Sequence, residues 1–147
     1  MDISNLLKSL NAHKVAYVVI GATAFPVHGY SRATMDIDVF IKPTRQNAQA
    51  TIEALKSFGY DTSDLSIKDI LTKKVLIRQY LVQTDIHPFV KGITFKQAWA
   101  NKVKSKIGRA SAYFASLDDL IQMKKAAGRP QDKADLKVLN RLKKNAI

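Results

Sequence analysis

The chain has 147 residues, 46% of them hydrophobic and 24% charged, which is typical of a single folded domain over residues 1–147 and unlike a disordered or collagenous protein. It contains no cysteine, which excludes a disulfide framework, a thiolate zinc site and a cysteine nucleophile, and fits the reducing cytoplasm. The net charge is +12, and it is concentrated in residues 91–147, which carry 14 basic and 4 acidic groups against 10 and 8 in residues 1–90.

The first 31 residues are predicted to form a helix, a strand and a second helix. Apolar residues recur at helical spacing over residues 2–12 (Ile3, Leu6, Leu7 and Leu10). A continuous apolar run then predicts a buried strand over 15–20 that stops at Gly21, and Thr23 is expected to cap a helix over 24–28 with Pro26 in its first turn. The N-terminus has no secretory signal, and the apolar run over 15–27 is too short to span a membrane, so we expect a soluble cytoplasmic protein without membrane contact.

A second strand is predicted where apolar and polar residues alternate over 36–42. Because side chains in a strand point alternately to opposite faces, Asp36 and Asp38 share the polar face. Thr44 is predicted to cap a long helix that ends at Phe58, before Gly59. The predicted inner stripe of that helix consists of Ala48, Ile52, Leu55 and Phe58.

The remaining elements alternate between strands and short helices. A short helix is expected within residues 60–74, followed by strands over 75–77 and 80–87, a helical turn near 95–99 and a hairpin over 103–114 that turns at Gly108. The strand over 80–87 places one set of residues on its polar face (Leu81, Gln83, Asp85 and His87). Two closing helices are separated by residues 128–130, and their apolar stripes consist of Leu117, Leu120 and Ile121 and of Leu136, Leu139 and Leu142.

The arrangement of aspartates indicates metal chemistry. Two carboxylates at positions i and i+2 of one strand can bind hard divalent cations such as Mg²⁺, and Asp85 on a later strand is a candidate third ligand. The strand that ends at Gly21 and Ala22 and turns into a helix would bring backbone N–H groups close to bound phosphates. Taken alone, an Asp-x-Asp pair is more often a solvated strand face than a metal site.

Three segments together resemble the nucleotidyltransferase superfamily, in particular its minimal members and the related abortive-infection (AbiEii-like) toxins. Residues 20–39 resemble the family's glycine turn, helix, His-Gly, Arg-x-Thr and Asp-x-Asp signature. Asp85-Ile86-His87 is similar to its third-carboxylate strand, and residues 116–136 are similar to its closing helices. The resemblance therefore spans nearly the whole chain.

This resemblance implies an α/β (α+β) fold with a mixed β-sheet flanked by helices, and transfer of a nucleoside monophosphate from an NTP with release of pyrophosphate. Asp36, Asp38 and Asp85 would bind Mg²⁺ or Mn²⁺, and Asp85 would help to activate the acceptor. The toxin type would add a protein antitoxin as a partner. Ala22 stands where the family often has serine or a second glycine, so this chain offers no hydroxyl there to hold the terminal phosphate.

Other residues have both a functional and a structural interpretation. Gly21 and Ala22 are assigned to nucleotide binding, as are Arg32 and Lys124. Arg32 could instead brace the aspartate-bearing strand, and Lys124 could be a lysine at the edge of an apolar stripe that reaches solvent. His87 could lie near the metal or the acceptor, but a packing or hydrogen-bonding role is favoured.

Two functions compete at this point. One is an active nucleotidyltransferase that modifies RNA, such as tRNA, or a protein. The other is a catalytically weak or inactive module of the same fold that binds nucleic acid or a partner protein. Three retained carboxylates favour the enzyme, because negative charge weakens a pure phosphate binder. The basic C-terminal third favours RNA, although a lysine-rich surface can also serve solubility alone.

Overall fold

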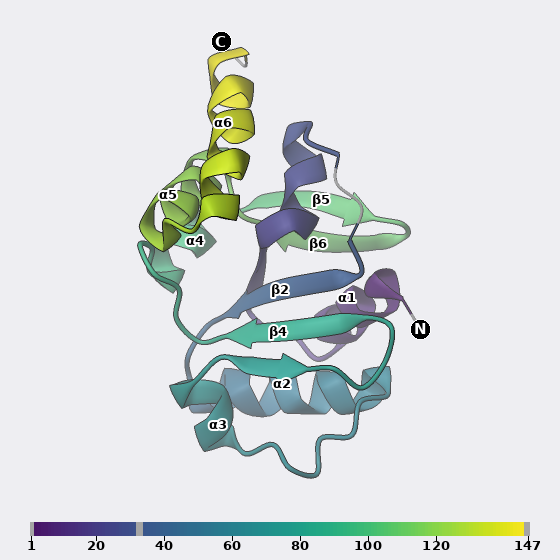
Figure 1. Ribbon diagram of the computed structural model, residues 1–147. Helices are drawn as coiled ribbons and strands as arrows, with labels where there is room; N and C mark the ends of the chain where they lie inside the picture. The colour runs from purple at the N-terminus through teal and green to yellow at the C-terminus, as the bar shows by residue number, and fades with distance from the viewer. Residues whose placement is uncertain (1, 32–33, 146–147) are drawn as a thin grey trace.

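A mixed β-sheet forms the centre of the computed structural model, which describes residues 2–31 and 34–145 (Figure 1). Its six strands lie in the order β3-β4-β2-β1-β6-β5, with bounds β1 Tyr17–Ile20, β2 Asp36–Ile41, β3 Val75–Ile77, β4 Gln83–His87, β5 Val103–Ile107 and β6 Ala110–Phe114. Strands β1 and β6 are parallel, as are β2 and β4, and the other neighbouring pairs are antiparallel. The predicted mixed sheet flanked by helices is confirmed.

The helices cover both faces of this sheet. They are α1 Ile3–Ala12, the 3₁₀ helix η1 Gly21–His28, α2 Arg45–Phe58, α3 Ile67–Thr72, α4 Phe95–Asn101, α5 Leu117–Ala127 and α6 Pro130–Asn145. Helices α1 and α2 lie against each other behind the strands, whereas α4, α5 and α6 gather beside the other face (Figure 1). Phe95 of α4 packs edge-on against Phe40 of β2, on the strand face that also carries Asp38.

Local sequence signals account for most of these elements. Asp2 caps α1 and Thr44 caps α2, in each case by accepting a hydrogen bond from a backbone N–H group of the first turn. All four residues of β1 are buried, as its continuous apolar run predicts. The buried apolar side chains form one cluster between the sheet and the helices. No described helix is both long and apolar enough to cross a membrane.

The turn after β1 differs from the prediction. Helix η1 begins directly at Gly21 rather than after Thr23, because Gly21 adopts a φ of +71° that lets the chain turn at once. Thr23 caps no helix, since its hydroxyl donates to the carbonyl oxygen of Asp36 at 2.7 Å. Pro26 is accordingly the sixth residue of the helix and not part of its first turn.

Two further predictions were wrong in detail. Strand β4 begins at Gln83 and not at residue 80, because residues 79 and 80 bond instead to the loop at residues 59–61, and Leu81 is left 77% exposed. In α2, Ile52 and Phe58 are only partly buried, whereas the polar residues Asn47 and Thr51 are fully enclosed. The Asn47 amide bonds to backbone groups of Ala16 and Lys42, a role that a hydrophobic pattern does not reveal.

Candidate functional site

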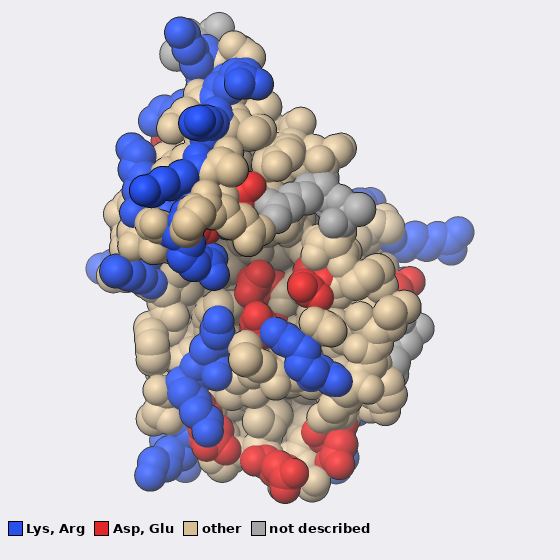
Figure 2. Space-filling model, viewed as in Figure 1, with Lys and Arg blue, Asp and Glu red and all other residues tan. Residues whose placement is uncertain are grey.

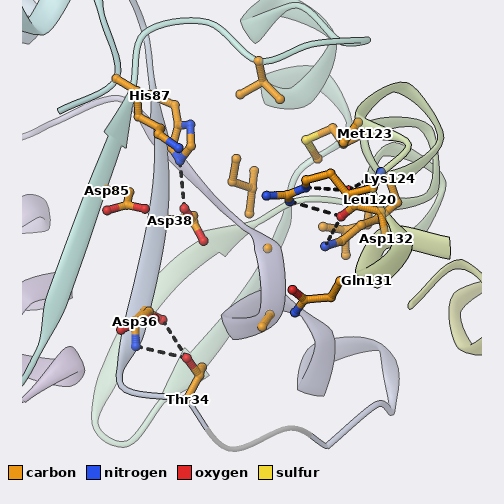
Figure 3. Close-up of a pocket in the computed structure, with 17 residues that line it drawn as sticks. Thr34, Asp36, Asp38, Asp85, His87, Leu120, Met123, Lys124, Gln131 and Asp132 are labelled. Atoms are coloured by element: carbon orange, nitrogen blue, oxygen red, sulfur yellow. Dashed lines mark hydrogen bonds and ion pairs between the residues drawn. The ribbon is translucent and has the colours of Figure 1, made fainter. Parts of the chain in front are cut away.

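The parallel pairing of β2 with β4 brings together two aspartates that lie far apart in the sequence. The register places Asp38 opposite Asp85 and Phe40 opposite His87. Because side chains alternate along a strand, Asp38, Asp85 and His87 all point to the same face. One ligand atom from each of the three lies within 4.8 Å of the others, and His87 Nε2 is 2.8 Å from Asp38 Oδ1 (Figure 3). Two carboxylates and one imidazole at this spacing can bind a divalent cation.

Asp36 lies on the same strand face but outside this close group. It is two pairs further back along β2, opposite Gln83, and its side chain is exposed. Its backbone is held firmly, because its N–H donates to the hydroxyl of Thr34 at 3.0 Å and its carbonyl accepts from Thr23. Figure 3 shows its carboxylate apart from the other two. The structure thus joins Asp38 and Asp85 and places Asp36 at the side of the same pocket.

The three aspartates line a pocket of about 450 Å³. Its walls come from the start of η1, from β2 and β4, and from the facing sides of α5 and α6. Gly21, Ala22 and Lys124 all line it, as sequence analysis expects of nucleotide-binding residues. Arg32, the fourth residue assigned to the nucleotide, lies outside the described residues. The pocket falls within the 300–1,000 Å³ typical of small-molecule sites.

Gly21 lies directly against Asp38. A Cβ atom built on Gly21 would come within 2.7 Å of Asp38 Oδ2, and the backbone φ of +71° is one that side-chain-bearing residues rarely adopt. Glycine is therefore required for two reasons, the turn into η1 and the space for the carboxylate. The close approach keeps the backbone at the start of η1 next to the cluster of Asp38, Asp85 and His87.

We expect Gly21→Ala to weaken binding of a divalent cation severalfold, because the new methyl group displaces Asp38. It should also cost about 1–2 kcal/mol of folding stability from the left-handed backbone alone. Gly29→Ala is the matched control, since Gly29 also has a positive φ (+97°) but its Cβ would meet only Leu142, at 3.7 Å. Urea denaturation and Mn²⁺ titration should show a stability loss in both variants and a binding loss only in Gly21→Ala. Equal cation binding in the two variants would contradict the assignment.

The guanidinium group of Arg78 contacts Asp85, the second carboxylate of the close group. Arg78 Nη1 donates to Asp85 Oδ1 at 2.7 Å, and this hydrogen bond raises the pKa of the Arg78 guanidinium above its ordinary value. Asp36 and Asp38 add to the negative field around Arg78. Arg78 carries no distinguishing pattern in the sequence. The hairpin of β3 and β4 pairs Leu76 with Asp85, and Arg78, two residues after Leu76, reaches the carboxylate diagonally.

The opposite wall of the pocket contains an ion-pair network built around the buried carboxylate of Asp132. Lys124 Nζ lies 3.1 Å from Asp132 Oδ1 and 3.2 Å from Asp135 Oδ2, and Arg129 Nε lies 2.7 Å from Asp132 Oδ2. Hydrogen bonds from Arg129 and then from Lys124 hold the pKa of the fully buried Asp132 far below its ordinary value. The ammonium group of Lys124 is therefore held by two carboxylates at the pocket wall, with its side chain 15% exposed. Asp132 and Asp135 do more than favour the helix dipole, because they join α5 to α6.

Each of the three histidines makes a hydrogen bond. His87 makes a hydrogen bond to Asp38, as favoured, and it also lies in the candidate metal-binding group, which agrees with the other interpretation. The other two histidines bond to backbone carbonyl groups, His13 to Ser9 and His28 to Ala115. Among the described residues, the metal-binding geometry therefore involves His87 and neither of the others.

A protein-family model described as "Nucleotidyltransferase of unknown function (DUF6036)" matches residues 1–144. The comparison with curated proteins gives no match. The family match agrees with the superfamily resemblance of residues 20–39 and 116–136, and it does not extend to the abortive-infection toxin type.

Proposed function

The chain belongs to this nucleotidyltransferase family, and on that basis we propose that it transfers a nucleoside monophosphate from an NTP to an acceptor hydroxyl, releasing pyrophosphate. The observation that supports the proposal most strongly is the register of β2 and β4, which sets Asp38 beside Asp85 at the wall of a pocket large enough for a nucleotide. In the balanced reaction, the acceptor oxygen bonds to the α-phosphorus, the bond from that phosphorus to pyrophosphate breaks, and the acceptor loses its proton.

The donor set fits a divalent cation, since Asp38 and Asp85 offer carboxylate oxygens within a few ångströms of each other. These two residues would hold Mg²⁺ or Mn²⁺, with Asp36 available to a second ion at the side of the pocket. A bound divalent cation lowers the pKa of an attacking hydroxyl and neutralises charge on a departing pyrophosphate. Asp85 is assigned to the acceptor side, where its carboxylate orients the hydroxyl.

The nucleotide is assigned to the wall formed by Gly21 and Ala22. These residues open η1 at the pocket, and the first N–H groups of a helix have no partners within it, so they can bind phosphate oxygens. Arg32 and Lys124 are assigned to the same phosphates. The ammonium group of Lys124 already contacts two carboxylates, so it would contribute by holding the wall of α5 and α6 in place as well as by its charge.

The positive charge of the surface favours RNA as the acceptor. Of the four acidic residues in 91–147, Asp119, Asp132 and Asp135 are buried, so the exposed surface of this region is more basic than its composition suggests. Four exposed basic residues spaced four apart form a cationic ridge, with Arg129 directly before α6 and Lys133, Lys137 and Arg141 on the helix. Four helical residues rise by about 6 Å, so the ridge presents one positive charge in each such step.

The ridge leads away from the catalytic pocket. Arg129 lines the pocket, and the three residues that follow extend along α6 toward the C-terminus. Figure 2 shows Lys and Arg gathered over α5 and α6, beside a hollow in which acidic side chains, drawn in red, are exposed. A polyanion bound along the ridge would thus have one end near Asp38 and Asp85. We therefore assign RNA, such as tRNA, as the acceptor.

We expect RNA affinity to fall steeply with salt, and Lys133→Gln, Lys137→Gln and Arg141→Gln combined to make the slope of log K against log salt shallower by about two to three units. Each lost phosphate contact removes about 0.7 to 0.9 from that slope. The control removes three exposed lysines from helices that lie away from α6, Lys8 on α1, Lys56 on α2 and Lys68 on α3 (Figure 1), and should leave the slope unchanged. Similar slopes in both triple variants would favour a protein acceptor and a solubility role for the lysines.

The decisive test of the function is incubation of the protein with each labelled NTP, Mg²⁺ or Mn²⁺, and total cellular RNA and protein. Label in an RNA band supports the full proposal, and label in a protein band keeps the transferase but replaces its acceptor. No label with any NTP would favour the catalytically inactive binding module. A toxin role with a protein antitoxin is supported only by the resemblance of residues 20–39, 85–87 and 116–136. It predicts growth arrest on expression that Asp38→Asn relieves.

A further inference from the structure

We propose that His87 binds the same divalent cation as Asp38 and Asp85, and that its nitrogen makes this centre select a first-row transition metal ion such as Mn²⁺ over Mg²⁺. The inference rests on the proposed function for the presence of a cation at this site. It adds a ligand that the carboxylate pattern does not contain, and this ligand shifts the preference of the site away from Mg²⁺ and toward ions that accept nitrogen.

The position of His87 is fixed by the sheet. It follows Asp85 by two residues on β4, so both side chains emerge on the same face, and its partner in the parallel register is the buried Phe40. Its side chain is only 15% exposed, and its Nε2 atom is directed at Asp38 Oδ1, 2.8 Å away. Figure 3 shows the imidazole beside Asp38 and at the pocket wall. The nitrogen is thus held within reach of the oxygens that a cation would use.

The mixed donor set distinguishes between metals. Mg²⁺ is a hard ion that prefers oxygen ligands in a near-ideal octahedron and keeps several of its waters. First-row transition ions accept imidazole nitrogen together with carboxylate oxygen. With three protein ligands at most in this group, several positions around the cation would stay open to phosphate or acceptor oxygens.

Arg78 increases the importance of the nitrogen donor. Its guanidinium contacts Asp85 at 2.7 Å and offsets one of the two negative charges of the close group. The non-selective attraction of the site for any dication is weakened by this charge. The contribution of His87, which does not depend on net charge, therefore becomes a larger share of the binding free energy.

The alternative is that His87 only donates a hydrogen bond that orients Asp38. His87→Gln separates the two roles, because the glutamine amide can still donate a hydrogen bond but is a poor ligand for a transition metal ion. His13→Gln is the matched control, since His13 lies at the end of α1 and bonds to the carbonyl of Ser9. Circular dichroism and thermal unfolding without metal should show that both variants fold like the wild type.

The test is pulsed EPR on the full chain loaded with Mn²⁺ and without nucleotide, together with Mn²⁺ and Mg²⁺ titrations. We expect a ¹⁴N coupling in the wild type and in His13→Gln that is lost in His87→Gln. The Mn²⁺ dissociation constant should rise at least tenfold in His87→Gln, while the weaker Mg²⁺ binding changes less than threefold.

Mn²⁺ that binds in an Asp38-dependent manner without ¹⁴N coupling would overturn the inference and leave the proposed function standing. A coupling that persists in His87→Gln, or a wild type that binds Mg²⁺ as tightly as Mn²⁺, would also overturn it. If neither cation binds in a way that Asp38→Asn or Asp85→Asn abolishes, the proposed function itself fails.

Discussion

Asp38→Asn and Asp85→Asn should each reduce nucleotide transfer about a thousandfold or more, because a metal ion that stabilises transition-state charge contributes several kcal/mol. Each substitution removes one of the two carboxylate charges of the close group while keeping the size of the side chain. The fold should survive, since both residues are only partly buried and lie at the pocket wall rather than in the core. Initial rates with the labelled NTP that the wild type prefers measure the effect.

Asp36→Asn should also reduce nucleotide transfer, but without weakening the binding of a cation to the close group. Asp36 lies outside the close group, so its variant should keep the cation affinity of Asp38, Asp85 and His87 while transfer falls. Asp61→Asn is a suitable control, because Asp61 is an exposed carboxylate in the loop before α3. Wild-type transfer rates in Asp38→Asn or Asp85→Asn would defeat the assignment of the active site.

Asp132→Asn should destabilise the fold by about 1.5–3 kcal/mol at pH 7, because it weakens the charge-assisted hydrogen bonds that the buried carboxylate accepts from Lys124 and Arg129. Asp132 is fully buried between Lys124 and Arg129. Part of the loss should be offset because Lys124 keeps Asp135 as a partner. Urea denaturation measures the change in the free energy of unfolding.

The ion pairs of Asp132 also predict that the free energy of unfolding depends on pH. The folded-state pKa of Asp132 lies below its ordinary value of 3.8, so its stabilising contribution is fully present above about pH 4 to 5 and is lost as the pH falls below 3.8 toward the folded-state pKa. The gap in stability between wild type and Asp132→Asn should therefore narrow at pH 3.

Asp118→Asn is the matched control for both experiments. Asp118 also pairs with a lysine, Lys143 at 2.8 Å, but its side chain is 71% exposed. An exposed pair is worth about 0–1 kcal/mol, so the control should stay close to the wild type. An equal loss in Asp118→Asn, or a gap for Asp132→Asn that does not change with pH, would contradict a special role for the buried network.

Local periodicity was enough to predict most elements and the faces on which the aspartates lie. Alternation over 36–41 placed Asp36 and Asp38 on one side of β2, and the same rule placed Asp85 and His87 together on β4. The cap at Thr44 and the turn at Gly108 were likewise readable, because each depends on a few neighbouring residues. The predictions failed at Thr23, whose hydroxyl bonds to the carbonyl of Asp36. They also failed at the expected start of β4, where the side chain of Gln79 bonds to the backbone of Asp61.

Tertiary structure alone decided which chemistry-bearing residues meet. The contact between Asp38 and His87 spans 49 residues of sequence and depends on β2 and β4 becoming parallel neighbours. The same pairing separates Asp36 from the close group. The contacts of Arg78 with Asp85 and of Lys124 with Asp132 arise in the same way, from a hairpin and from the packing of α5 on α6. Side-chain direction repeats within one element and is therefore local, whereas strand order and register are set by burial of the whole core, which no single segment determines.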